Sequence, residues 1–384
     1  MTEEEINSSA NNLKSENKSI INDLLKELEL ENELEKLTNK RKIQELDPNE
    51  YDRLIDIMIE VYELPVQDQE RIKPKRHIKP NNKLAKEITH NFINKGTQSL
   101  IVRNRIKPEI ITNVALTYEA NEHEKFTLYD REVHDSVITL YEAGNKIISA
   151  GTVYRAMNGL VKSEKASPQA IETVTRSLEK SRLIMLDIDC KREKEKHYKD
   201  KDFKSEYKGF LFDCNKLTVP TKNQSKIVYE FLDKPILYEY AQMSKQIINV
   251  PIELLHTEWG KRNSEELIIM RGCLLRHIED MKWASFQRRN NKIRLKGYKD
   301  HKGFHNGIYE ELDVTFDNYS DSAYKKKTYD IRKNIEEILT EWKNQKYVDN
   351  YEFYKQGKTI IGVAVSLPDK KENSSSKNNR TKKQ

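Results

Sequence analysis

The feature that most constrains the fold lies near the end of the chain, where a helix pattern is followed directly by a hairpin pattern. Residues 322–346 repeat apolar side chains every three or four positions, as a helix with one buried face requires. This stripe consists of Ile331, Ile335, Ile338 and Trp342. Residues 348–354 and 359–365 are β-type segments that flank a turn containing Gly357. The combination predicts an α+β unit in which a helix packs beside a two-stranded ribbon.

The solvent side of this unit is predicted to be cationic. The helix face opposite the stripe carries Lys326, Tyr329, Lys333 and Glu337, and the hairpin turn carries Lys355 and Lys358. A preceding helix from about residue 264 is followed by a basic cluster that includes Arg288 and Arg289. Cationic side chains on a helix and on a nearby hairpin can meet the phosphates of nucleic acid. The plainer interpretation is a packing unit with ordinary solvated charges.

An earlier part of the chain repeats this order of elements. Thr127 and Asp130 have the spacing of a capping box and open a helix that Gly144 ends. A short helix ends at Gly159, and a third helix begins at Ser167-Pro168, an N-cap followed by proline at the first helical position. Strand-like residues 183–189 and 209–213 then flank a lysine-rich segment that contains Lys194 and Lys196. We expect these two strands to form a basic hairpin behind the helices.

The third of these helices has a candidate DNA-reading face. Ile171, Val174 and Leu178 are predicted to point inward, because they share one face at 100° per residue. The opposite face carries Gln169, Thr173, Arg176 and Lys180. Glutamine can pair with adenine and arginine with guanine, whereas threonine and lysine can hold phosphates or bases. This face is therefore predicted to enter a DNA major groove.

With these elements in place, the chain resembles the winged-helix replication initiators of plasmids, the Rep proteins. The resemblance lies in the order of parts over about residues 95–366: the opening helix Leu128-Tyr129-Asp130-Arg131-Glu132-Val133, the helix at Ser167-Pro168 with its hairpin, and a second such unit that ends at Val365. It is architectural, since no motif in it is diagnostic. It implies binding to repeats at a replication origin, help in opening the duplex, and recruitment of the host helicase machinery.

The predicted architecture is thus α+β, with two tandem winged-helix domains after an N-terminal helical segment. We expect disorder in residues 1–17 and amphipathic helices in residues 18–70, which either pack on their own domain or dock a partner or second copy. A basic, proline-containing linker is predicted for residues 71–94. The first winged helix is assigned to residues 95–216, the second to residues 217–366, and a disordered basic tail to residues 367–384.

Charge and cysteine content agree with an intracellular, DNA-binding protein. The net charge is +6, but residues 1–47 hold 12 acidic and 7 basic side chains, so the remainder carries +11. A basic body suits a polyanionic partner. Cys190, Cys214 and Cys273 have no paired spacing for zinc or disulfides, and no apolar run is long enough to span a membrane. The expected location is the cytoplasm.

No catalytic or cofactor motif is found in the sequence. His301 and His305 have helical metal-site spacing, but Gly303 between them indicates a loop. Gly357-Lys358-Thr359 resembles the end of a phosphate-binding loop, but position 352 is Glu and the triplet lies in a hairpin turn. Asp187 and Asp189 do not single out a nuclease site. We therefore expect no enzyme activity, no cofactor and no metal.

The leading hypothesis is sequence-specific binding of double-stranded DNA at the replication origin of a plasmid or similar mobile element. A winged-helix transcriptional regulator would share every feature above. An interaction scaffold that uses the N-terminal helices is the alternative from another class. The partners predicted are origin repeats, host helicase or initiator proteins docked on the N-terminal helix, and a second copy in a homodimer.

Overall fold

The protein is described here from a computed structural model, and the chain divides into two compact units. One contains Met1–Lys73, Ala143–Ser149 and Asn215–Glu230, and the other, the large unit, contains Pro74–Glu142, Ala150–Cys214 and Phe231–Gln384. The structure describes Glu33, Lys36 and residues 74–90, 92–93, 96–103, 111–118, 124–159, 166–197, 204–220, 225–244, 246–256, 264–283, 291–301 and 303–368. Apart from helical Glu33 and Lys36, the predicted N-terminal segments lie outside these residues. So does the predicted tail beyond residue 368.

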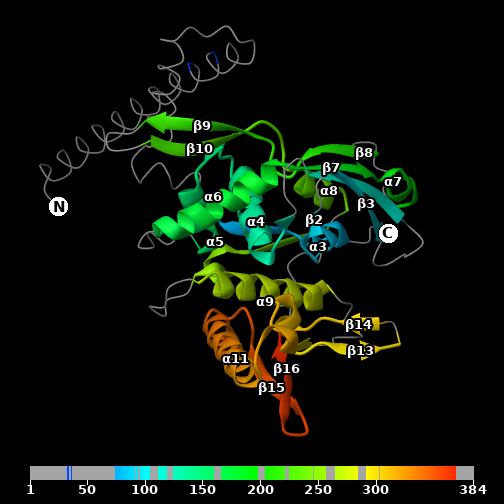
Figure 1. Ribbon diagram of the computed structural model, residues 1–384, viewed down its shortest axis with the longest axis vertical. Helices are drawn as coiled ribbons and strands as arrows, with labels where there is room; N and C mark the ends of the chain where they lie inside the picture. Colours follow the sequence, from blue (N-terminus) through cyan, green and yellow to red (C-terminus); the bar gives the residue numbers. More distant parts are fainter. Residues whose placement is uncertain are drawn as a thin grey trace, which may run out of the picture. The chain divides into compact units, whose positions relative to one another are not determined.

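The fold is a mixed α+β structure, which confirms the predicted class (Figure 1). Helices α3 to α11 belong to the large unit, where they pack among small sheets. The strand pairs of the described residues are antiparallel. Outside the two clusters described below, the elements are α3 (Lys83–His90), β2 (Phe92–Ile93), β5 (Glu124–Lys125), α8 (Ile236–Met243) and the 3₁₀ turn Ile252–Leu255.

The first helical cluster consists of α4 (Leu128–Glu142), α5 (Ala150–Met157) and α6 (Pro168–Arg182). The capping box is confirmed: the Thr127 amide donates to Asp130 at 2.7 Å, and the Asp130 amide donates to the Thr127 hydroxyl at 3.1 Å. The Ser167 hydroxyl caps α6 by accepting from the Ala170 amide at 3.2 Å, with Pro168 at the first helical position. Local sequence therefore specifies the start of both helices.

The hairpin predicted behind α6 belongs to a larger sheet. Strands β7 (Ile184–Asp189) and β8 (Glu206–Phe210) do pair antiparallel, but β7 also pairs with β4 (Ile111–Tyr118), and β4 pairs with β3 (Gly96–Arg103). The segment between β7 and β8 holds helix α7 (Lys191–His197) rather than an open loop. The prediction of a free basic hairpin is wrong here, because the alternating apolar side chains of β7 need a covered sheet face.

The predicted basic linker is also corrected. Residues Arg76–Pro80 form strand β1, which pairs along its length with β11 (Ile247–Pro251). His77, Ile78 and Lys79 are buried. The lysines and prolines of this segment suggested an extended, solvated arm, but a strand is extended too, and tertiary charge partners allow Lys79 to enter the core.

The other compact unit contributes a three-stranded sheet among its described residues. Its order is β6 (Ile147–Ile148), β10 (Ser225–Phe231) and β9 (Cys214–Pro220), with Tyr229 opposite Ile148. Along the chain, β6 lies between α4 and α5, and the β9–β10 pair follows α6 and the four-stranded sheet. The predicted boundary at residues 216–217 falls inside β9.

The second cluster follows the same order of elements. Helix α9 (Glu265–Trp283) is followed by β12 (Lys292–Arg294), the hairpin β13 (Tyr298–Asp300) and β14 (Gly303–His305), α10 (Ile308–Glu311), a 3₁₀ turn (Phe316–Asn318) and α11 (Asp321–Asn344). Strands β15 (Asn350–Gln356) and β16 (Thr359–Ser366) complete a sheet of order β12-β16-β15. In both three-stranded sheets the short first strand pairs with the last strand, which is central.

Candidate nucleic-acid interface

Helix α11 is held by the apolar stripe that the sequence predicts. Ile331, Ile335, Ile338 and Trp342 are all buried in one core with residues of α9 and of the β12-β16-β15 sheet. The Trp342 indole donates a hydrogen bond to the Leu254 carbonyl at 2.9 Å, which satisfies the one polar atom of this side chain. The helix is therefore fixed in rotation, and its opposite face must point to solvent.

That opposite face is exposed and carries charges of both signs, because Asp330 and Glu337 lie one turn after Lys326 and Lys333. Lys326, Tyr329 and Lys333 are exposed, and 60% of the Tyr329 surface is accessible. None of the carboxylates that the structure describes forms an ion pair with Lys326 or Lys333. Their ammonium groups are free to meet an external anion, as the sequence predicts.

The hairpin after α11 has the predicted turn. Gln356 pairs with Thr359, and Gly357 adopts φ +60°, a left-handed conformation that glycine adopts with little strain. Lys355 and Lys358 on either side of it are exposed. The turn that resembles a phosphate-binding loop in sequence is a β-hairpin tip, as predicted, rather than the start of a helix.

Helix α6 presents only part of its predicted face. Gln169 and Arg176 are exposed and Thr173 is half-buried, with its hydroxyl donating to the Gln169 carbonyl at 3.0 Å. Arg176 pairs with Glu172 one turn earlier at 3.5 Å, and both side chains are exposed. An exposed pair of this kind contributes little stability, so the guanidinium remains accessible to a ligand.

The outward orientation predicted for Lys180 is wrong. Its ammonium group pairs with Asp130 at 2.8 Å and donates to the Lys125 carbonyl at 3.0 Å. The two side chains are only 10% and 6% exposed. The same Asp130 carboxylate closes the capping box of α4, so Lys180 joins the end of α6 to the start of α4. The helical period could not predict this ion pair. It shows on which side of the helix a side chain lies, but it does not show which residues of other elements lie next to that side chain.

The remaining predicted residues lie elsewhere. Lys194 is half-buried in α7, and Lys196 belongs to the same helix, though its side chain lies outside the description. Both residues lie between β7 and β8, as predicted, but in a helix rather than in a hairpin. Arg288 and Arg289 lie outside the described residues, so their predicted role stays a prediction.

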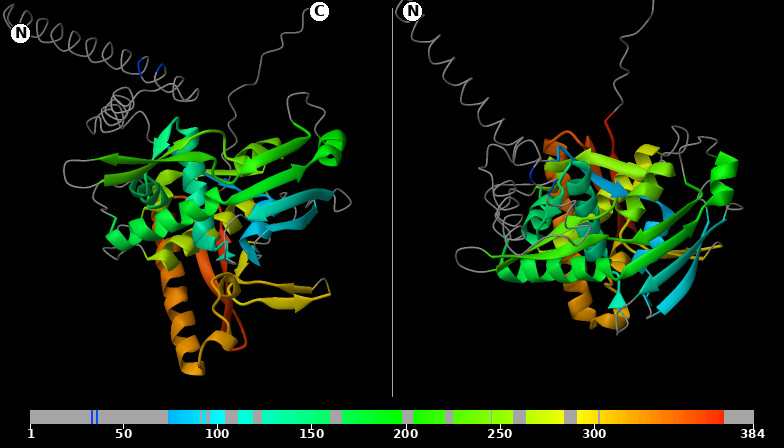
Figure 2. Two further views of the ribbon diagram at one scale, coloured as in Figure 1. Left: turned by 45° about the horizontal axis from the view of Figure 1, so that its top comes forward. Right: turned by 90° about the horizontal axis from the view of Figure 1, so that it is seen from above.

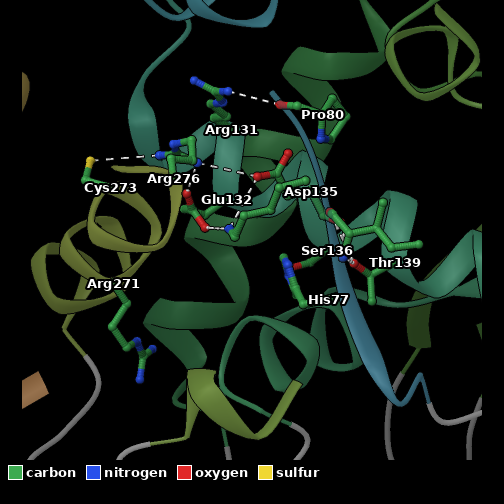
Figure 3. Close-up of polar contacts among 12 residues, drawn as sticks. His77, Pro80, Arg131, Glu132, Asp135, Ser136, Thr139, Arg271, Cys273 and Arg276 are labelled. Atoms are coloured by element: carbon green, nitrogen blue, oxygen red, sulfur yellow. Dashed lines mark hydrogen bonds and ion pairs between the residues drawn. The ribbon is translucent and has the colours of Figure 1, made fainter. Parts of the chain in front are cut away.

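A buried charge cluster joins α4 to α9, and the sequence analysis missed it (Figure 3). Lys79 of β1 pairs with Glu132 and, at 3.3 Å, with Asp135. Arg276 of α9 pairs with the same two carboxylates at 2.6 and 3.5 Å. The Arg131 guanidinium donates to the Pro80 carbonyl at 3.1 Å. Two cations thus neutralise two carboxylates inside the core, as buried charges require.

The cluster extends through hydrogen bonds and one close backbone approach. His77 Nε2 lies 3.1 Å from the Ser136 hydroxyl, and Arg271 donates to Asn158 Oδ1 at 2.8 Å. A methyl group at Gly272 would collide with the Glu132 carboxylate, so glycine allows α9 to approach α4 this closely. The only sequence signal for this contact is that α4 carries charges at adjacent turns, a pattern equally typical of a solvated helix.

Burial and neighbouring charges shift the pKa values of the cluster in opposite directions. Burial alone would raise the pKa of Glu132, but the charges of Lys79 and Arg276 lower it to about 2. Burial raises the pKa of Asp135 to about 6, although Lys79 acts against that rise. Burial also lowers the pKa of His134 to about 4, with a smaller effect from Arg131. Glu132 is therefore the firmly ionised member.

Among the described residues, no three His, Cys, Asp or Glu side chains are grouped as a metal site. His305 pairs with Asp300 at 3.0 Å within the β13–β14 hairpin, and His301 lies at its turn. No helix in the described part of the chain is long and apolar enough to cross a bilayer.

Comparison with known proteins gives distant structural neighbours only. No protein-family model and no curated protein matches the chain. Two crystal structures of domains 2 and 3 of RctB are similar to it, one at TM-score 0.33 and 10% identity, the other at 0.35 and 8%. They cover 71% and 72% of this chain and 91% and 92% of their own. A likeness this distant identifies neither a family nor a function for this chain.

Proposed function

We propose that the chain binds double-stranded DNA through two winged helices and that the second makes the main phosphate contacts. In both clusters a helix is followed along the chain by a short strand, two further helices and a pair of strands. In the second set, α11 would enter the major groove and the β15–β16 hairpin would lie along the backbone. The observation that carries the proposal is the outward face of α11, with cations that no described carboxylate neutralises, followed by a lysine-tipped hairpin.

We further propose that the DNA site lies at a replication origin of a plasmid or similar element. The order of parts is similar to that of plasmid initiators, and two DNA-reading units in one chain suit repeated sites. Recruitment of host replication proteins through the N-terminal helices, and dimerisation, are part of this proposal and depend on residues outside the description. A transcriptional regulator would use the same interface.

A binding experiment tests the DNA interface. The full chain is titrated with duplexes selected from a random pool and with direct repeats flanking its own gene, at 50 to 200 mM salt. We expect affinity to fall steeply with salt, and the double variant Lys326→Gln/Lys333→Gln to make the log–log slope shallower by about 1.8, at about 0.9 per phosphate contact. A scaffold without a DNA site would show neither behaviour.

The matched control is Lys191→Gln/Lys208→Gln, which removes the same charge. These exposed lysines pair with Glu206 at 2.6 Å and with Asp187 at 3.9 Å, and neither lies on α11. Equal effects of both double variants would contradict a specific interface on α11.

Deleting the gene separates an initiator from a transcriptional regulator: loss of plasmid copies supports initiation, and altered transcription at normal copy number supports regulation. Cleavage of plasmid DNA that requires divalent metal would contradict a purely binding role.

A further inference from the structure

A second cationic surface lies on β12 and its continuation, away from the face of α11. Lys292, Arg294 and Lys296 alternate with Ile293 and Leu295, which are buried in the core of the second cluster. Within β12, Lys292 and Arg294 point to one side and are about 6.7 Å apart, at roughly 3.3–3.4 Å per residue, and Lys296 follows in the bend after the strand. This separation is similar to that of successive phosphates along one strand of nucleic acid. We call these three cations the β12 strip.

Each cation of the β12 strip lies over an aromatic ring. The Lys292 ammonium is 5.0 Å from the centre of the Tyr354 ring, the Arg294 guanidinium is 4.2 Å from that of Tyr298, and the Lys296 ammonium is 5.2 Å from that of Phe316. A cation held over a ring loses less conformational freedom when it binds an anion, while its charge remains. The strip is therefore preorganised for an anionic partner.

The rings themselves are already engaged within the protein. Tyr298 stacks on His305 with centroids 4.9 Å apart, and Phe316 stacks on Tyr324 with centroids 3.8 Å apart. Tyr298 and Phe316 are partly exposed, at 36% and 53%, but each already contacts another ring and a cation. Stacking with unpaired bases, which is how single-stranded nucleic acid is usually held, would compete with these contacts, whereas phosphates of duplex DNA would not.

Few acidic groups oppose the β12 strip. No carboxylate of the described residues forms an ion pair with its three cations. Glu352 faces Lys292 across Ala364 in the sheet register, and Asp300 pairs with His305 in the adjoining hairpin. Glu352 across the sheet and Glu310, which accepts from the Gly297 amide next to Lys296 at 2.7 Å, are outnumbered by the three cations, so the strip keeps a net positive charge.

Lys292 and Arg294 of the β12 strip lie on the face of the sheet opposite α11, whereas Lys296 lies over Phe316, which stacks on Tyr324 of α11. Ile293 packs in one core with Ile331 and Ile335 of α11, so the neighbouring Lys292 and Arg294 point to the other face. The β13–β14 hairpin, which carries Tyr298, projects away from α11 in both views (Figures 1 and 2). A straight duplex held by α11 therefore cannot also lie along the strip.

We propose that the β12 strip is a second, sequence-independent binding surface for the phosphate backbone of duplex DNA. It engages either a distant part of a bent duplex or a second duplex. The inference does not depend on α11 reading base sequence, because it is carried by a separate set of cations.

The test compares two triple variants of the full chain that lose equal charge. Lys292→Gln/Arg294→Gln/Lys296→Gln removes the β12 strip. Lys191→Gln/Lys204→Gln/Lys208→Gln removes exposed lysines that each pair with a carboxylate. The probe is a 30-base-pair random duplex, about the length of a typical site, and the same sequence as a single strand serves for comparison.

We expect the strip variant to make the salt slope for the duplex shallower by about 2.7, at about 0.9 per phosphate. It should also lose a second binding event per protein while keeping the preference for the selected site over random DNA. Thermal unfolding of each variant, and recovery of binding by Lys292→Arg/Lys296→Arg, verify that the fold is intact.

Three results would overturn the inference. The strip variant could match the control triple in its salt slope, or lose single-strand binding while duplex binding stays unchanged. It could also lose sequence preference in parallel with the α11 variant, which would place the strip in the primary interface. If only Lys326→Gln/Lys333→Gln left the salt slope unchanged, the result would contradict the proposed function but not the role of the β12 strip.

Discussion

Helices α6 and α11 occupy corresponding places in the two clusters, yet they use their cations differently. Near the end of α6, Lys180 forms a buried ion pair with Asp130, and Arg176 forms an exposed ion pair with Glu172. On α11, Lys326 and Lys333 have no such partner among the described carboxylates. The same sequence signature therefore stabilises the fold in one place and remains available to a ligand in the other.

The difference shows that a cationic helix face is not by itself a binding surface. A lysine whose charge is neutralised by a buried carboxylate releases no counterion from DNA, whereas a solvated lysine does. In the first cluster the remaining candidates are Gln169, Thr173 and Arg176, which suit base reading better than general phosphate binding. The second cluster then supplies most of the affinity.

The largest expected effect tests whether the two clusters are one energetic unit. Glu132→Gln removes the carboxylate shared by Lys79 of β1 and Arg276 of α9. We expect the free energy of unfolding in urea to fall by about 3–5 kcal/mol, because a buried cation is left with too little compensating charge. Glu336→Gln on the exposed side of α11 is the control and should change it by less than about 0.5 kcal/mol. A small loss for Glu132→Gln would mean that the clusters are joined by apolar packing alone.

A matched pair of lysine variants tests the comparison directly. Lys180→Met should cost about 3 kcal/mol of unfolding free energy, since it leaves the nearly buried Asp130 without its partner. Lys333→Met should cost less than about 0.5 kcal/mol but weaken DNA binding. Chemical denaturation and a gel-shift titration measure the two quantities. Similar losses of unfolding free energy in both variants would contradict the view that the cation of α6 stabilises the fold and that of α11 does not.

The histidines of the two opening helices provide a pH test. Burial lowers the pKa of His134 in α4 to about 4, below the ordinary value of about 6.5, so the unfolded chain takes up this proton first as pH falls. The stability contributed by neutral His134 is complete above pH 6.5 and is lost towards pH 4. His134→Leu should therefore gain about 2 kcal/mol relative to wild type between pH 7 and pH 5.

His277 in α9 provides the contrast for that experiment. Burial alone would raise the pKa of Glu311, but the hydrogen bond and charge of His277 lower it to about 2. His277→Leu removes this partner and should destabilise the protein at pH 7, because the stability that ionised Glu311 contributes is fully present above pH 4.5 and is lost as pH falls towards 2. The raised pKa of Asp135 acts in the opposite sense to His134 in wild type, because its protonation below pH 6 favours the folded state. Comparing each variant with wild type at the same pH cancels that contribution.

The smallest expected effect separates base reading from backbone binding. Arg176→Ala should reduce the preference for the selected site over random DNA by at least about 1 kcal/mol, if the guanidinium pairs with guanine. Lys355→Gln/Lys358→Gln should weaken binding to all sequences alike. Competition gel shifts with the selected duplex and a random duplex measure this preference. An unchanged preference in Arg176→Ala would assign sequence reading to α11 instead.

The sequence located α4, α5, α6, α9 and α11, but it missed α3, α7 and α8 and did not identify the sheets. The caps at Thr127 and Ser167, the stripe of α11 and the hairpin at Gly357 all depend on contacts within a few residues, and all were confirmed. The partners of β7 come from β4, about 70 positions earlier, and β1 pairs with β11, about 170 positions later. Strand periodicity shows that a segment is extended but does not identify its neighbour.

The sequence by itself determined where helices begin, which of their sides are apolar, and that the last hairpin turns at a glycine. Only the tertiary structure decided which charges are available to a ligand. Lys79 entered the core because two carboxylates of α4 and an arginine of α9 meet there, and Lys180 turned inward because Asp130 lies beside it. A charge is stabilised by whatever surrounds it in space, and neither helical period nor composition carries that information.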